Sequence, residues 1–129
     1  MKRLLFFCIF LIFSKSIFSQ VTKNPLVERN KAHGAKISWI DTFCSDRTTI
    51  GIDFTNVFFW YQWVMISPDT YIEYINPETG LSERKQIICL QTATGSNLSF
   101  STRYTYQHLP YNSMVLRFPI LPVGVSRIN

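Results

Sequence analysis

The chain has 129 residues, with 13 Lys and Arg against 8 Asp and Glu, which gives a net charge of +5. This length fits one domain with a modest core, and an aromatic content of 16% argues against a disordered chain. Three of the basic residues lie in the first twenty positions, and the longest basic run after them is Arg84-Lys85. Nucleic-acid binding needs clustered basic side chains, so we expect no nucleic-acid partner.

The first twenty residues have the layout of a cleavable export signal. Two basic residues precede an unbroken apolar run over 4–13, and small polar residues follow it. The run is too short for a membrane-spanning helix, which needs about 20 apolar residues. We expect residues 1–19 to be the signal peptide, with cleavage between Ser19 and Gln20, or alternatively after Ser16. The mature protein would then be extracytoplasmic (periplasmic, outer-envelope or secreted), with no transmembrane span.

Two cysteines, Cys44 and Cys89, follow the predicted signal. The compartment expected for the mature chain is oxidising, which permits a disulfide between them. The alternative is two separate thiols, one of them a small core side chain. The distance between the two Cα atoms decides between these alternatives.

The rest of the chain divides into a leader and a domain. Residues 20–34 form a polar leader with room for one short edge strand. Residues 35–129 form the folded domain, in which segments rich in β-branched and aromatic side chains alternate with turn residues. Strands are expected over 35–43, 48–54, 62–66, 70–75, 85–91, 100–106, 114–118 and 125–128.

The first two of these strands have a clear period of two and predict a hairpin. Alternation over 48–54 places three apolar side chains inward and three small or polar residues outward; these are Ile50, Ile52 and Phe54, and Thr49, Gly51 and Asp53. Over 35–43, one face is predicted to carry Ala35, Ile37, Trp39 and Phe43.

The strand pattern predicts the fold class. No window of eleven or more residues after the signal has a convincing helical period. Seven or eight short strands indicate an all-β protein, an antiparallel immunoglobulin-like β-sandwich. A small β-barrel is the alternative.

Motifs for catalysis and metal binding are missing from the sequence, including H-E-x-x-H, G-x-S-x-G, the Walker loop and C-x-x-C. His33 and His108 are the only histidines. Either could act as a general base for Cys89 or a serine, but the sequence identifies no third orienting group. Two histidines with scattered carboxylates also provide too few grouped ligands to indicate a zinc site. We therefore expect no enzyme, no catalytic residues, no metal and no cofactor.

The segment 57–64 has five aromatic residues in six positions. Phe58, Phe59 and Tyr61 lie where a loop joins a strand. They either cap one end of the fold or form an exposed patch that binds a ligand or partner. A competing surface is an edge strand over 125–128, which would be open to β-augmentation.

Two segments resemble a known family. WVMISPDTYI over 63–72 and LRFPILPVGV over 116–125 resemble an exported β-sandwich domain common in Bacteroidota. In that family a W-[IV]-x-I strand runs into a Pro/Thr-Tyr strand, and an F-x-x-L-P-x-G turn precedes the last strand. The resemblance covers about residues 36–128 and implies a β-sandwich, often the N-terminal module of a longer envelope protein. The resemblance assigns no functional residues to this chain. The similar domains continue past this last strand, whereas the sequence given ends at Asn129.

These observations predict a secreted or envelope-associated binding or accessory module without catalytic activity. Its partner would be another envelope protein or an extracellular ligand. A structural envelope component and a small secreted hydrolase are the alternatives.

Overall fold

The computed structural model describes residues 21–23, 25, 34–42, 46–54, 63–105 and 108–129. Within these ranges the regular elements are β-strands and short 3-10 turns such as η2 (Pro110–Asn112), and every strand pairing is antiparallel. The predicted all-β class is therefore confirmed. None of the described residues belongs to a helix long and apolar enough to cross a bilayer.

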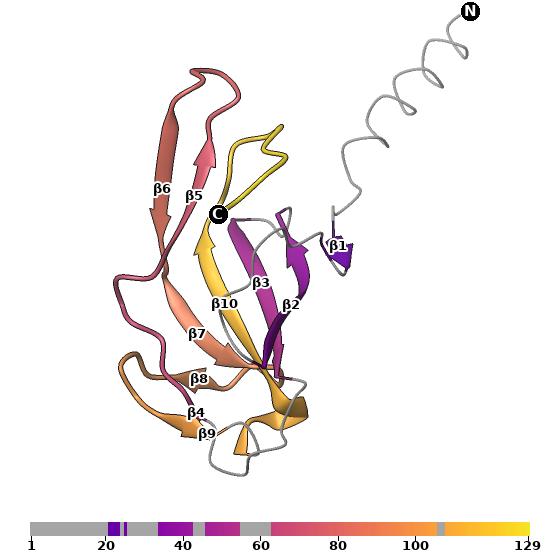
Figure 1. The fold of residues 1–129 in the computed structure, drawn as a ribbon, viewed down its shortest axis with the longest axis vertical. Coiled ribbons are helices and arrows are strands. Elements are labelled where there is room, and N and C mark those ends of the chain that lie inside the picture. Colours follow the sequence, from indigo (N-terminus) through magenta and orange to yellow (C-terminus); the bar gives the residue numbers. More distant parts are fainter. Residues whose placement is uncertain (1–20, 24, 26–33, 43–45, 55–62, 106–107) are drawn as a thin grey trace, which may run out of the picture.

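Six strands form the main sheet, in the order β1-β2-β3-β10-β7-β8 (Figure 1). They are β1 (Val21–Lys23), β2 (Ala35–Asp41), β3 (Arg47–Phe54), β10 (Ser113–Pro119), β7 (Cys89–Thr92) and β8 (Asn97–Leu98). The predicted hairpin is present as β2 and β3. The short edge strand expected in the leader is β1, which pairs with β2. Within the described residues the sheet ends at β1 and β8 and closes no barrel, so the barrel alternative is wrong there.

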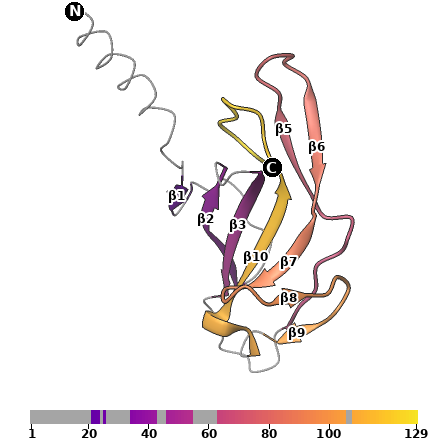
Figure 2. The ribbon, with the colours of Figure 1, turned by 180° about the vertical axis from the view of Figure 1, so that it is seen from behind.

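Two smaller units complete the fold. One is the hairpin of β5 (Tyr71–Ile75) and β6 (Ser82–Gln86), and the other pairs β4 (Trp63–Val64) with β9 (Tyr104–Thr105). The two views place the turn of the β5–β6 hairpin at one end of the domain, and β4, β8 and β9 at the opposite end (Figure 1 and Figure 2).

The chain passes from the β5–β6 hairpin into the main sheet between β6 and β7. The Ile87 N–H still donates to the carbonyl oxygen of Thr70, the residue directly before β5, at 2.8 Å. The next N–H, from Ile88, donates instead to Arg117 O of β10, at 2.7 Å. The single strand expected over 85–91 is therefore divided, because successive N–H groups point in opposite directions and meet different partners.

One continuous core fills the space against one face of the main sheet. Its fully or nearly buried side chains come from the main sheet, from β5 and from the connecting segments; they are Ile50, Phe54, Ile72, Tyr74, Ile87, Leu90, Leu109, Met114, Leu116, Phe118 and Leu121. This arrangement of antiparallel sheets is consistent with a β-sandwich.

A β-bulge in β2 overturns one predicted face. Ile37 pairs with Ile52, but Trp39 pairs with Gly51, so one extra residue, Ser38, lies between them. The Ser38 hydroxyl donates to Gly51 O at 3.1 Å. Because the extra residue reverses the alternation, Trp39 lies on the outer face of the main sheet, opposite Ile37. The prediction that the two side chains share a face is wrong.

Candidate functional site

The aromatic residues predicted to bind a partner, Phe58, Phe59 and Tyr61, lie outside the described residues, and the prediction stays open. Cys44 also lies outside them. Cys89 is half-buried at the start of β7. The Cys44–Cys89 disulfide therefore also stays a prediction.

Of the two histidines considered as general bases, one lies within the described residues. His33 lies outside the described residues. His108 is exposed, and its Nδ1 atom contacts the hydroxyl of Thr105. Within the described part of the chain, no three His, Cys, Asp or Glu side chains are grouped as metal ligands.

The predicted edge strand over 125–128 is reduced to a single bridge between Ile128 and Tyr74 of β5. Beside this bridge, the Asn129 N–H donates to Glu73 O at 2.8 Å, and the Glu73 N–H donates to Asn129 O at 3.0 Å. The C-terminal segment thus lies along the edge of β5 that faces away from β6.

The β5–β6 hairpin presents one face to the core and the other to solvent. Ile72 and Tyr74 point to the core. The opposite side, which we call the hairpin face, is made by three directly opposed pairs, namely Tyr71 with Gln86, Glu73 with Arg84, and Ile75 with Ser82. This division follows from the period of two along each strand.

Arg84 organises the hairpin face. Its Nε donates to Glu73 Oε2 at 2.7 Å, and its guanidinium lies over the Tyr71 ring, 4.3 Å from the centroid. The hydrogen bond from Arg84, followed by one from Ser82, lowers the pKa of Glu73. The same bond to Glu73 raises the pKa of Arg84. Both side chains are therefore charged at neutral pH and are held in one arrangement.

A second set of hydrogen bonds supports the hairpin from its other side. The Tyr74 hydroxyl donates to Glu83 Oε2 at 2.7 Å, and Asn76 Nδ2 donates to Glu83 Oε1 at 2.9 Å. These two bonds lower the pKa of Glu83. Burial, aided by the bond to Glu83, raises the pKa of Tyr74 to about 12. Because Tyr74 is also part of the core, the network ties the hairpin to the rest of the domain.

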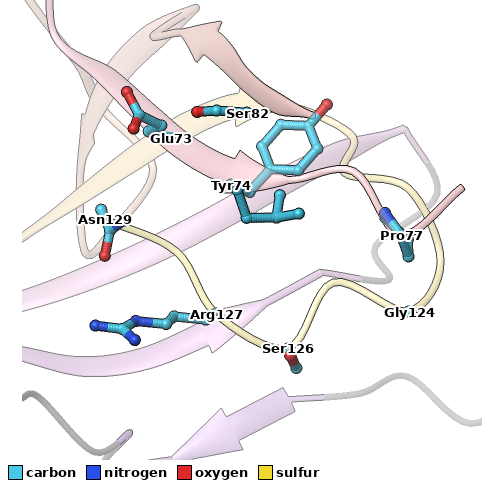
Figure 3. Close-up of a pocket in the computed structure, with 9 residues that line it drawn as sticks. Glu73, Tyr74, Pro77, Ser82, Gly124, Ser126, Arg127 and Asn129 are labelled. Carbon is cyan, nitrogen blue, oxygen red and sulfur yellow. The ribbon is translucent and has the colours of Figure 1, made fainter. Parts of the chain in front are cut away.

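A pocket of about 360 Å³ opens between the hairpin and the C-terminal segment (Figure 3). Figure 3 shows Glu73, Tyr74 and Ser82 on one side of it, and Ser126, Arg127 and Asn129 on the other. Ile75, Pro77 and Gly124 complete the lining. Glu73, Ile75 and Ser82 also belong to the hairpin face, so the pocket and the hairpin face form one continuous surface.

The C-terminal wall of the pocket is attached at both ends. At one end, the N–H of Leu121 donates to the fully buried hydroxyl of Thr48 at 3.2 Å. At the other, Asn129 pairs with Glu73. Between them, Gly124 has a φ of +94°, and a Cβ there would lie 3.5 Å from Pro77 Cγ. A positive φ favours glycine, so Gly124 lets the chain turn back towards β5.

Exposed apolar side chains lie at the same end of the domain. Ile75 is 58% exposed, Leu81 66% and Val123 93%. The hairpin turn and the loop that carries Val123 are neighbours in both views (Figure 1 and Figure 2). Apolar residues of this size next to a pocket are typical of binding surfaces.

A similar pair of side chains lies at the opposite end. Arg103 lies over the ring of Trp63, 4.5 Å from the centroid, and Trp63 is half exposed. This pair does not line the pocket described above. The pair therefore provides a matched comparison for Tyr71 and Arg84.

Comparison with protein-family models, curated proteins and solved structures finds no match to this chain. The resemblance to the exported Bacteroidota domain is not tested by these comparisons.

The hairpin face has a local pattern in the sequence from which it could have been predicted. Y-x-E-x-I over 71–75 and S-x-R-x-Q over 82–86 alternate on the two sides of the N-P-E-T-G turn. Counted outward from the segment 76–81, equal spacing places the alternate residues opposite one another. The pocket left no such signal, because its other wall comes from a distant part of the chain.

Proposed function

We propose that this chain is an exported, immunoglobulin-like β-sandwich module that binds a ligand or partner and catalyses no reaction. The observation that supports it best is the continuous surface formed by the hairpin face and the pocket. Ion pairing, the Tyr74–Glu83 bond and the two attachments of the C-terminal segment hold this surface in place. A preformed surface loses little entropy when a ligand binds.

The state of Glu73 on this surface, and of Glu83 on the other side of the hairpin, supports binding over catalysis. A general acid or base works best with a pKa near the operating pH. The pKa values of Glu73 and Glu83 are both lowered by their hydrogen-bond partners. Each carboxylate is thus a charged hydrogen-bond acceptor at neutral pH and a poor proton donor.

The export part of the proposal rests on residues 1–19, and the Bacteroidota resemblance agrees with it. An exported chain would meet another envelope protein or an extracellular ligand.

Partner capture tests the proposal. The full chain is expressed with a C-terminal tag, and its intact mass after recovery should equal residues 20–129 plus the tag. Ligands or proteins retained from extracellular medium and envelope extract are then compared for wild type, Arg84→Ala and Arg103→Ala. Arg84→Ala should lower retention by about tenfold, because it removes a charged contact and releases Glu73 and Tyr71. Arg103→Ala should leave retention unchanged. Equal retention by all three proteins, or recovery of the uncleaved chain, contradicts the proposal.

A further inference from the structure

We infer that the hairpin face and the adjoining pocket bind a neutral oligosaccharide, an inference that rests on the proposed function. Sugar rings present a face of C–H groups that packs on aromatic rings, and a rim of hydroxyls that both donate and accept hydrogen bonds. The surface offers matching groups for both.

The aromatic contact is Tyr71. Its side chain remains 46% exposed although Arg84 lies over the ring. The guanidinium is in turn held by Glu73, so the ring and the charged group form one rigid unit. An exposed aromatic side chain that is already ordered is a favourable anchor, since little side-chain entropy is lost on binding.

The polar groups beside Tyr71 suit hydroxyls. Glu73 provides carboxylate acceptors, Arg84 provides donors, and Ser82 can do both. Gln86 lies directly opposite Tyr71, and its Nε2 is held by Pro68 O at 2.8 Å. The amide oxygen of Gln86 is chemically a further acceptor.

Charge at the hairpin face favours a neutral ligand. The hairpin face carries one carboxylate and one guanidinium, joined at 2.7 Å, and these cancel; the pocket lining adds Arg127, which has an interaction of its own. An anionic ligand would compete with Glu73 for Arg84, and a cationic ligand would compete with Arg84 for Glu73. A hydroxyl can bond to either without breaking the pair.

The shape favours a chain of several sugars. From Tyr71 to Ile75 the strand advances four residues, or roughly 13 Å at the usual rise of a strand. The pocket of about 360 Å³ lies along this strand from Glu73 to Ile75 and continues to Pro77 and Gly124. A single ring bound at Tyr71 would leave the pocket empty.

A peptide fits this surface less well. Peptides that add to a sheet use the backbone groups of an edge strand. At the centre of β5 these groups are bonded to Asn129, through both the N–H and the C=O of Glu73. The hairpin face itself offers side chains only.

The test is calorimetric titration of the full chain, as recovered after expression, with four hexasaccharides. Three are neutral, built of glucose, mannose or galactose, and one is built of galacturonic acid. We expect at least one neutral hexasaccharide to bind. Tyr71→Ala should weaken that binding about tenfold or more, equal to about 1.4 kcal/mol, whereas Tyr71→Phe should keep it within about twofold. Trp63→Ala, which removes the matched aromatic at the other end, should have no effect. Circular dichroism checks that each variant is folded.

Each other outcome overturns the inference. Binding of no neutral hexasaccharide, binding of the acidic one alone, or equal loss in the Tyr71 and Trp63 variants would do so. If no neutral sugar binds but a protein from envelope extract is captured through Arg84, the inference fails and the proposed function stands. If neither binds, both fail.

Discussion

The contact between Trp39 and Gly51 gives the sharpest test of the fold. A Cβ placed on Gly51 would lie 2.2 Å from Trp39 Nε1, 2.4 Å from Cε2 and 2.7 Å from Cδ1. Non-bonded carbon atoms normally approach to roughly 3.5 Å. The indole would therefore have to move by more than about 1 Å, away from the sheet on which it packs.

The expected cost of Gly51→Ala follows from two opposing effects. Overpacking of this kind costs about 1–3 kcal/mol. Replacing a glycine within a strand by alanine stabilises the folded state by about 0.5–1 kcal/mol, because the unfolded chain then has less conformational entropy to lose. We therefore expect Gly51→Ala to lower the free energy of unfolding by about 1–2 kcal/mol, measured by urea denaturation of the full chain.

A double-mutant cycle isolates the cause. In a Trp39→Ala background the Cβ meets no indole, and Gly51→Ala should stabilise the protein by about 0.5–1 kcal/mol. The decisive result is that the effect of Gly51→Ala on the free energy of unfolding changes sign between the two backgrounds. If Gly51→Ala is equally harmful in both backgrounds, the bulge does not place Trp39 over Gly51 and the outer-face assignment is wrong.

Two further predictions concern the supports of the candidate site. Thr48→Val should destabilise the fold by about 1–3 kcal/mol in urea denaturation, because the buried N–H of Leu121 loses its acceptor; Thr102→Val, at an exposed hydroxyl, is the control and should be nearly neutral. Tyr74→Phe should remove a bond to Glu83 and cost about 1 kcal/mol at neutral pH. The lowered pKa of Glu83 means that its contribution is present above the ordinary value of 4.5 and is lost as the pH falls through the folded-state pKa. Tyr74→Phe should therefore lose less stability than wild type on acidification, and an unchanged acid profile would contradict this role for Glu83.

Local features of the sequence were enough to predict the fold class and one hairpin. Period-two alternation over 48–54, together with turn residues on both sides, predicted the strand that became β3. Strand-forming side chains next to turn residues predicted a strand over 70–75 in the same way, and this strand became β5. Both features concern neighbours along the chain, whose geometry depends on backbone sterics and side-chain alternation.

The rest was decided by tertiary contacts. Alternation shows which residues share a face but not which strand they will pair with, so the pairing of β3 with β10 carried no local signal. The bulge at Ser38 broke the alternation that placed Trp39 with Ile37. Thr49 does lie on the outer face, as alternation predicted, yet it is buried there.

The candidate site shows the same limit. The order of residues 71–86 determined that Tyr71, Glu73 and Arg84 would lie on one side of a hairpin. That this side faces solvent depends on which face of the hairpin packs on the core, through Ile72 and Tyr74. The pocket depends on the C-terminal segment returning to β5, where Asn129 meets Glu73. Such contacts join residues far apart in the chain, and they form only when burial of the shared core offsets the entropy of closing the long loop between them.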